Sequence, residues 1–187
     1  MLLAACDEFG PPAAEVRARL GDANQTRIEC AGPLVWLPIE TDLVLQRALD
    51  TVLGTERTRE FVLAKAREFL ATSLVQTAVS TAVSLFGLTP GSLARLVPPA
   101  WGFLYRDCGQ WTVSRSFEPD RARAREWREV EMRLAPLPAA CANEDAWLGA
   151  VGTILHALLV LGEREGEVEQ LERDATKVVF RLAWKRK

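Results

Sequence analysis

The sequence predicts an α+β domain in which N-terminal helices are followed by a hairpin, a central helix and a second hairpin. Two pairs of segments near the C-terminus alternate apolar and polar residues, the period of a half-buried strand. Between them, residues 143–162 are apolar on nearly every side, which is typical of a buried helix. We therefore expect a four-stranded antiparallel sheet packed on this central helix.

The chain totals favour one domain. Its 187 residues are 49% apolar and 26% charged, a balance typical of globular proteins. Residues 1–12, with Gly10 and the pair Pro11-Pro12, read as a flexible N-terminal arm. We expect residues 13–187 to form a single α+β domain of the ligand-binding kind discussed below.

Helical spacing dominates the N-terminal half. A short helix is predicted over Ala13–Leu20, ended by Gly21-Asp22, and Thr26–Trp36 is β-leaning. The next helix is predicted over Asp42–Leu53, with Thr41 as its N-cap and Gly54 as its stop. Thr55 is then expected to cap a helix with one charged and one apolar face.

No charged residue occurs from Phe69 to Ala94. A helix is predicted over Phe69–Phe86, with an apolar side and a polar side at helical spacing. The polar side is Ser73, Gln76, Thr77, Ser80 and Ser84. Serine and threonine are poor formers of helix interiors, so their regularity needs a reason. Three remain open: a helix–helix contact within the chain, a subunit interface, or a pocket wall that offers hydroxyls.

The helical part ends with Ser92–Asp107, which we expect to be interrupted or kinked at Pro98-Pro99. The first hairpin follows. Trp111, Val113 and Phe117 mark one strand, Glu118-Pro119-Asp120 the turn, and Val130, Met132 and Leu134 the second strand, which ends at Pro136 and Pro138.

The second hairpin comes after the central helix. Glu163–Gly166 is a predicted loop and Glu167–Arg173 a weaker strand. Lys177–Lys185 is the clearest strand in the chain. Its apolar face is Val178, Phe180, Leu182 and Trp184.

Charge and cysteine content argue against several functions. The net charge is −2, and the basic residues Arg121, Arg123, Arg125 and Arg128 alternate with acidic ones, which predicts a salt-bridged surface and no nucleic-acid site. Cys6, Cys30, Cys108 and Cys141 are too widely separated for the usual zinc spacings. We therefore expect the protein to be located in a reducing compartment, the cytoplasm.

The start, MLLAAC, looks like a lipoprotein cleavage box with Cys6 as lipid acceptor. A working signal needs a charged region and an apolar run of about 7–15 residues before the box, so we interpret this match as chance. The chain also lacks the roughly 20 apolar residues of a membrane span.

Enzyme motifs are absent from the sequence. It has no Gly-x-Ser-x-Gly elbow, phosphate-binding glycine loop or HExxH. Glu144-Asp145, at the start of the central helix, is explained by the helix dipole. We expect no catalytic residues and no enzymatic activity.

The run LARLVPPAWGFLYRDCGQWTV, the segment Leu134 to Cys141, and the closing strand VVFRLAW resemble the haem-nitric-oxide-binding-like and four-vinyl-reductase-like superfamily. More narrowly, the chain is similar to an uncharacterised bacterial paralogous branch of that group. The resemblance covers roughly Trp36 to Trp184. It implies a signalling domain, often dimeric, that senses a ligand or binds a protein partner.

Two features of that superfamily are missing here. Haem would require an axial histidine and a Tyr-x-Ser-x-Arg cluster, whereas Tyr105 is followed by Arg106 and Asp107, and His156 is not where the family's haem ligand lies. The last hairpin also lacks cysteines, which leaves Cys141 alone. We therefore expect no haem, no metal and no other cofactor.

The resulting hypothesis is a non-enzymatic sensory or regulatory domain that binds a small hydrophobic ligand or a protein partner. Its pocket is expected between the helix over residues 69–86, the segment over residues 92–107 and the central helix. The candidate liners are Leu74, Phe86, Trp101, Tyr105 and His156. The alternative is a ligand-free structural module that forms a homodimer through the polar stripe of residues 73–84.

Overall fold

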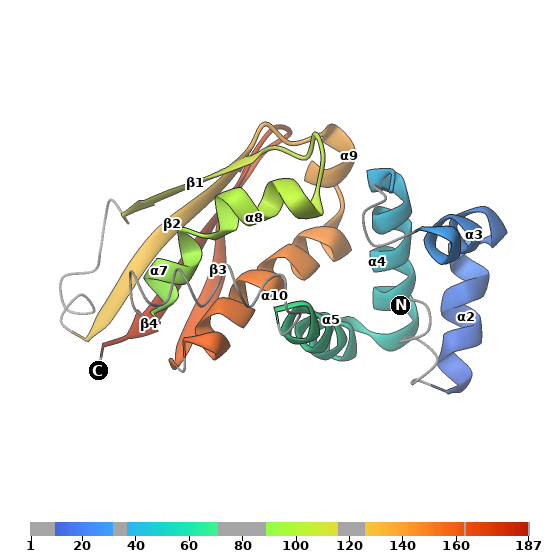
Figure 1. The fold of residues 1–187 in the computed structure, drawn as a ribbon, viewed down its shortest axis with the longest axis horizontal. Coiled ribbons are helices and arrows are strands. Elements are labelled where there is room, and N and C mark those ends of the chain that lie inside the picture. The colour runs from blue at the N-terminus through green and yellow to red at the C-terminus, as the bar shows by residue number, and fades with distance from the viewer. Residues whose placement is uncertain (1–9, 32–36, 71–88, 116–125, 163, 187) are drawn as a thin grey trace.

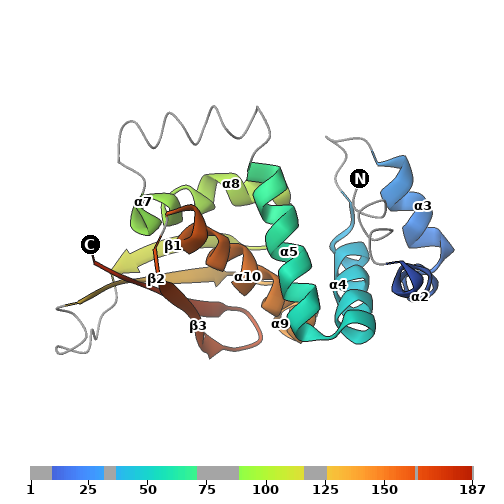
Figure 2. The same cartoon turned by 90° about the horizontal axis from the view of Figure 1, so that it is seen from below.

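The computed structural model describes residues 10–31, 37–70, 89–115, 126–162 and 164–186. It confirms the α+β class and the order of helices, hairpin, helix and hairpin (Figure 1). The central helix α10 (Asp145–Leu161) lies against the sheet, helices α4 and α5 pack on its other side, and α2 and α3 lie beyond them (Figure 2).

The N-terminal helices are α2 (Pro11–Leu20), α3 (Asp22–Cys30), α4 (Ile39–Leu53) and α5 (Thr55–Leu70). Gly21 (φ 75°) and Gly54 (φ 78°) separate neighbouring helices, and this left-handed backbone favours glycine. Their apolar faces form a small core that includes Val16, Leu49 and Phe61.

Three predictions in this region are wrong. Thr55 is not a cap, because it is the first residue of helix α5. Thr26 to Cys30 belongs to helix α3 and not to a strand; the helix has no buried residue and is tied to α2 by side-chain hydrogen bonds from Asn24 and Gln25. Thr41 is not an N-cap, because α4 begins two residues earlier, after Pro38. Its buried hydroxyl donates to Asn24 Oδ1 at 3.1 Å.

The predicted segment over residues 92–107 is two helices, α7 (Pro90–Ala94) and α8 (Val97–Leu104). The break falls at Arg95-Leu96 and not at the prolines. Pro98 and Pro99 lie in the first turn of α8, where the amide hydrogen that proline lacks has no helical partner anyway. Thr89 and Ser92 form a capping box that starts α7.

The sheet has the order β1-β2-β4-β3, and every neighbouring pair is antiparallel. Its strands are β1 (Gln110–Arg115), β2 (Trp127–Ala135), β3 (Gly166–Arg173) and β4 (Val178–Lys185). The predicted apolar faces of β2 and β4 are buried in the main core, where Met132, Phe180 and Leu182 meet Leu155 and Leu159 of α10. The short helix α9 (Ala139–Ala142) joins β2 to α10.

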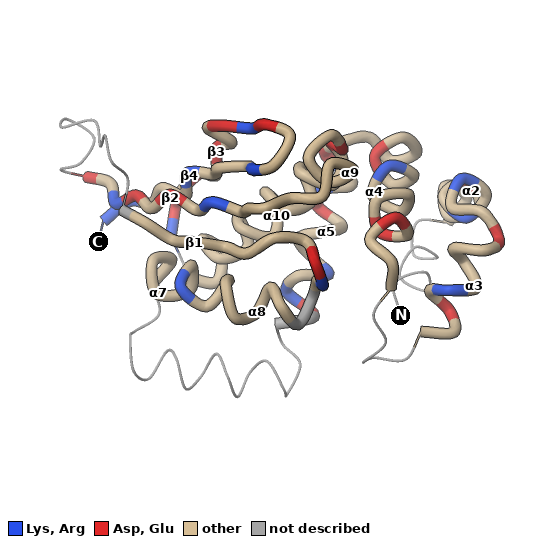
Figure 3. Tube along the Cα trace, turned by 90° about the horizontal axis from the view of Figure 1, so that it is seen from above, with Lys and Arg blue, Asp and Glu red and all other residues tan. Residues whose placement is uncertain are grey.

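Charged residues lie on the outer surfaces. Figure 3 shows both signs on α2, α3 and α4 and along the second hairpin. On that hairpin Arg181 pairs with Glu169, and Lys185 Nζ lies 2.8 Å from Glu165 Oε2. The face of the sheet away from α10 therefore carries ion pairs beside the buried Val179 and Ala183 of β4.

Several predictions fall outside the described residues. These are the polar stripe of residues 73–84 with Leu74 and Phe86, the Cys6 box, the turn at residues 118–120, and Arg121, Arg123 and Arg125. The boundary of the N-terminal arm also stays a prediction. Within the described parts of the chain, no helix is both long and apolar enough to cross a membrane.

Candidate functional site

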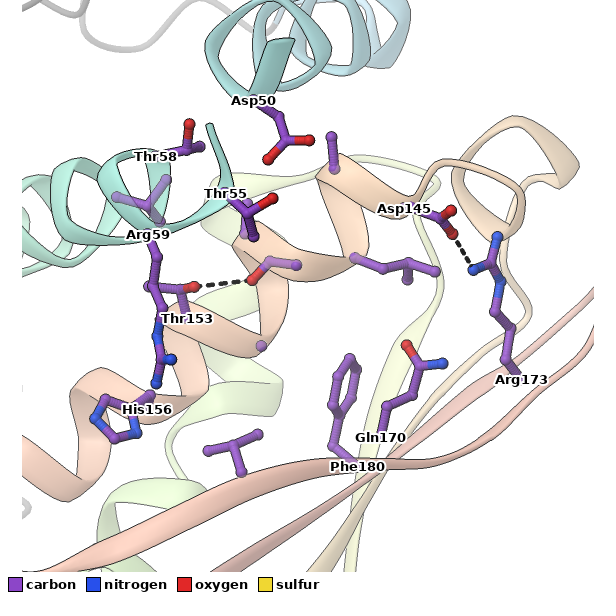
Figure 4. Close-up of a pocket in the computed structure, with 17 residues that line it drawn as sticks. Asp50, Thr55, Thr58, Arg59, Asp145, Thr153, His156, Gln170, Arg173 and Phe180 are labelled. Carbon is purple, nitrogen blue, oxygen red and sulfur yellow. Dashed lines mark hydrogen bonds and ion pairs between the residues drawn. The ribbon is translucent and has the colours of Figure 1, made fainter. Parts of the chain in front are cut away.

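A cavity of about 480 Å³ lies where α5, α10 and the second hairpin meet (Figure 4). We call it the α5–α10 cavity. Its apolar lining includes Val62 from α5, Leu148 and Ala150 from α10, and Val168 and Phe180 from the hairpin. Phe180 points from β4 toward α10 and forms the floor (Figure 4).

Glycines in α10 keep the cavity open. A Cβ placed on Gly149 would meet nothing within 4 Å, and one on Gly152 would lie 3.5 Å from the Phe180 ring. Glycine costs about 1 kcal/mol relative to alanine inside a helix. The two glycines therefore give up helix stability and provide space beside the sheet.

Two buried polar atoms of the lining residues have no hydrogen-bond partner. Thr58, from α5, is 6% exposed and its Oγ1 is unpaired. His156, from α10, has an unpaired Nδ1. Such atoms usually find a partner in folded proteins, so each calls for an explanation.

Arg59 extends from α5 toward the imidazole of His156 (Figure 4). Burial lowers the pKa of His156 below 6.5, and the charges of Arg59 and Arg67 lower it further. The imidazole is therefore neutral at pH 7. At this end the cavity combines a guanidinium with a neutral imidazole.

An ion pair closes the opposite end. Arg173, from β3, pairs with Asp145 at the start of α10, and its Nε donates to the carbonyl oxygen of Ala142 at 2.6 Å. Asp50, Thr55 and Thr58 line the cavity nearer to α4 (Figure 4). The Arg173 guanidinium is thus already engaged, whereas the structure shows no hydrogen bond or ion pair between Arg59 and a described residue.

The sequence-predicted liners do not meet in one pocket. Trp101 and Tyr105 line a different cleft of about 400 Å³ beside α8, together with Trp111, and it shares no lining residue with the α5–α10 cavity. Of the predicted residues that the structure describes, only His156 lines the larger cavity. His156 and Tyr105, which were both predicted to line one pocket, line different ones.

Tyr105 is part of a structural joint around Asp42. Its hydroxyl donates to Asp42 Oδ2 at 2.9 Å, Trp147 Nε1 donates to the same oxygen at 3.1 Å, and Gln46 Nε2 donates to Oδ1 at 3.2 Å. Burial raises the pKa of Asp42, and these three donors oppose the rise. Burial and the Asp42 charge raise the pKa of Tyr105 well above 10. The joint holds α4, α8 and α10 together.

Cys108 and Cys141 also come together. Both thiols are buried, and the hydrogen bond between them raises the pKa of Cys141, as does burial. Two sulfur atoms are fewer than the four ligands of a structural zinc site. Among the described residues, no group of three or more histidine, cysteine or acidic side chains is placed to hold a metal ion.

The fold and the cavity define a class: an α+β domain with a small-molecule-sized pocket between its helical part and its sheet. No family model matches the chain, and no curated protein matches it. One solved structure, from work on how protein-induced porphyrin distortion modulates haem redox potential, superposes with a TM-score of 0.53 at 10% sequence identity. The superposition covers 99% of this chain and 96% of the other. At this identity the similarity shows a shared fold and nothing more.

The described residues do not fit haem. A histidine that binds a metal ordinarily donates its second ring N–H to an acceptor, and His156 Nδ1 has none. Tyr105, the only tyrosine in the chain, is bound to Asp42 and does not line the His156 cavity. The fold therefore resembles that of a haem protein without the side chains that would hold haem in this cavity.

Sequence reasoning missed Thr58, Arg59 and the role of Asp42. Arg59 was one of several charged residues on the charged face of a predicted helix, and Asp42 was only the first residue of the helix before it. Only the two glycines of α10 gave a usable signal, because glycine in an otherwise apolar helix suggests a close approach or a space.

Proposed function

We propose that this chain is a non-enzymatic regulatory domain that binds a small, largely hydrophobic ligand in the α5–α10 cavity. The observation that carries this proposal is the unpaired Nδ1 of His156 on the wall of a cavity that also has an apolar floor at Phe180. A ligand that supplied a partner would remove the free-energy cost of leaving that atom unpaired.

The size of the cavity supports the proposal. Ligand pockets of small molecules commonly measure about 300–1,000 Å³, are mainly apolar, and hold a few polar groups that orient the ligand. The cavity of about 480 Å³ falls in this range. The resemblance to the haem-nitric-oxide-binding-like superfamily, and the haem-protein fold of the solved neighbour, favour ligand sensing as its role. We further propose that the ligand is not haem.

Binding is favoured over catalysis by the lining. The described residues around the cavity include no serine, cysteine or lysine that could act as a nucleophile. The Thr153 hydroxyl is used within α10, where it donates to the carbonyl oxygen of Gly149 at 2.9 Å. His156 would then orient a ligand and would not transfer a proton.

A Gly149→Leu variant tests the proposal. The new side chain enters open space, so the fold should be kept, and leucine should stabilise α10 by roughly 0.5–1 kcal/mol relative to glycine. Native and denaturing mass spectra of protein purified from cells should show added mass on the wild type that denaturation removes. That added mass should be absent from Gly149→Leu.

Gly102→Leu is the matched control. It also places leucine at a helical glycine with open space around it, but in the cleft beside α8. It should keep the added mass. If the added mass were kept in Gly149→Leu and lost in Gly102→Leu, the ligand would bind in the cleft beside α8. That result would contradict the proposal. The same spectra report whether the chain is a monomer or the homodimer of the alternative hypothesis.

A further inference from the structure

We infer that the ligand of the α5–α10 cavity is a small amphipathic organic acid whose carboxylate binds Arg59 and His156. The inference rests on the proposed function and adds the chemical class of the ligand. Its basis is the charge arrangement around the cavity together with the position of the apolar floor.

Arg59 is the cation available to an incoming anion. Of the two arginines that line the cavity, Arg173 is engaged by Asp145 and Ala142, whereas the structure shows no described partner for Arg59. A guanidinium offers paired N–H donors that match the two oxygens of a carboxylate. Arg59 extends over His156, so both groups can contact the same head group (Figure 4).

His156 completes the head-group site. Its neutral ring carries one N–H, and the unpaired Nδ1 can donate to a carboxylate oxygen in the tautomer that places the proton there. A bound anion would also offset the effect of Arg59 and Arg67, whose charges lower the pKa of His156. The ligand would thereby give the unpaired Nδ1 a partner and place a negative charge beside Arg59.

The other charges in the cavity limit the ligand to one negative charge. Asp50 and Asp145 also line it, so its two arginines are balanced by two aspartates. The second negative charge of a phosphate dianion or a dicarboxylate would be repelled by these two aspartates. The floor of Phe180, Val168 and Leu148 takes an aromatic or aliphatic body. A monocarboxylate with an aromatic or aliphatic group fits both the Arg59–His156 end and the apolar floor.

Dansylglycine and its uncharged amide, dansylglycinamide, form a matched pair of fluorescent probes. They share the aromatic body and differ in the carboxylate. We expect wild-type protein to bind dansylglycine more tightly. Arg59→Gln should weaken dansylglycine binding about tenfold or more, the loss expected for a charged hydrogen bond, and change amide binding less than about twofold. Arg59 is exposed, so this variant should unfold at the wild-type temperature.

Arg57→Gln is the control, since Arg57 is exposed on the same helix, lies two residues away and does not line the cavity. It should change neither affinity. Equal losses for both probes in Arg59→Gln, or no loss for either, would overturn the inference. Equal losses in Arg57→Gln and Arg59→Gln would also overturn it, because they would indicate general electrostatic attraction.

Gly149→Leu separates this inference from the proposed function. If Gly149→Leu bound neither probe and Arg59→Gln weakened both equally or not at all, the cavity would remain the binding site. The inference that it recognises a carboxylate would then be wrong. Unchanged binding of both probes in Gly149→Leu would reject the cavity itself. Absence of binding of either probe to the wild type would reject both.

Discussion

Asp42 shows how one buried carboxylate can organise three helices. It accepts hydrogen bonds from Tyr105 and Trp147 on one oxygen and from Gln46 on the other, and it is the shared partner of α4, α8 and α10. Burial raises the pKa of Asp42, and the hydrogen bonds from its three donors oppose this rise in part. Asp42 contributes to stability because it gives each of these three donors a hydrogen-bond acceptor.

We therefore predict that Asp42→Ala destabilises the protein by about 2–4 kcal/mol, because the Tyr105 hydroxyl and the Trp147 indole lose their acceptor. Asp42→Asn keeps one acceptor oxygen and should cost about 1 kcal/mol. Urea unfolding of both variants measures the difference. A loss below about 1 kcal/mol in Asp42→Ala would mean that water replaces the carboxylate and that the joint is not important for stability.

His156 should make stability depend on pH. Its folded-state pKa lies below the unfolded value of 6.5 because of burial and of Arg59 and Arg67 on α5; Gln170 and Val168, from β3, bring no opposing charge. The unfolded chain therefore takes up the proton first, and stability falls as the pH drops below 6.5. The loss levels off once the pH is below the folded-state pKa.

The measurement for this prediction is the free energy of unfolding of ligand-free protein at pH 7.5 and pH 5.5. His156→Leu should lose less stability than the wild type over this interval. An equal loss in both proteins would assign the pH dependence to other groups.

At the scale of elements, the strands were the most predictable. β2 alternates apolar and polar residues because it buries one face, and the sequence shows this directly. β4 buries residues on both faces, and its apolar core face is Val178, Phe180, Leu182 and Trp184. The backbone of the turn before β1 explains why that turn contains a glycine. Gly109 has φ 78°, and a Cβ there would lie 2.6 Å from the Pro136 carbonyl oxygen. Only glycine lets this turn approach the loop after β2.

Helix α3 was not predictable, because it buries none of its residues. Without a buried face, the 3.6-residue period has no cause, and the β-branched Thr26 and Ile28 suggested a strand. The break between α7 and α8 was misplaced for a different reason. Proline ends a helix when it lies inside one but is favoured in the first turn, and sequence alone does not separate these cases.

At the scale of the whole molecule, the cavity depends on residues that are far apart in the chain. Arg59, His156 and Phe180 come from α5, α10 and β4, and only the tertiary arrangement brings them together. The sequence identified His156 as a candidate because it is the only histidine. It could not show that Arg59 lies beside it, nor that Tyr105 is engaged elsewhere by Asp42.

The solved neighbour shares the layout of helices and sheet at 10% identity, and a shared fold does not fix the ligand. In this chain the described lining offers a guanidinium and a neutral imidazole above an aromatic floor. These groups suit the carboxylate that we propose as the head group of the ligand.

The most direct test of this account compares stability and binding in His156→Leu at pH 7.5. The free energy of unfolding of the ligand-free protein should stay within about 0.5 kcal/mol of the wild type, because leucine is apolar and removes an unpaired polar atom. Dansylglycine should bind about fivefold or more weakly. A loss of about 2 kcal/mol in stability with unchanged affinity would contradict the account and make His156 a packing residue of α10.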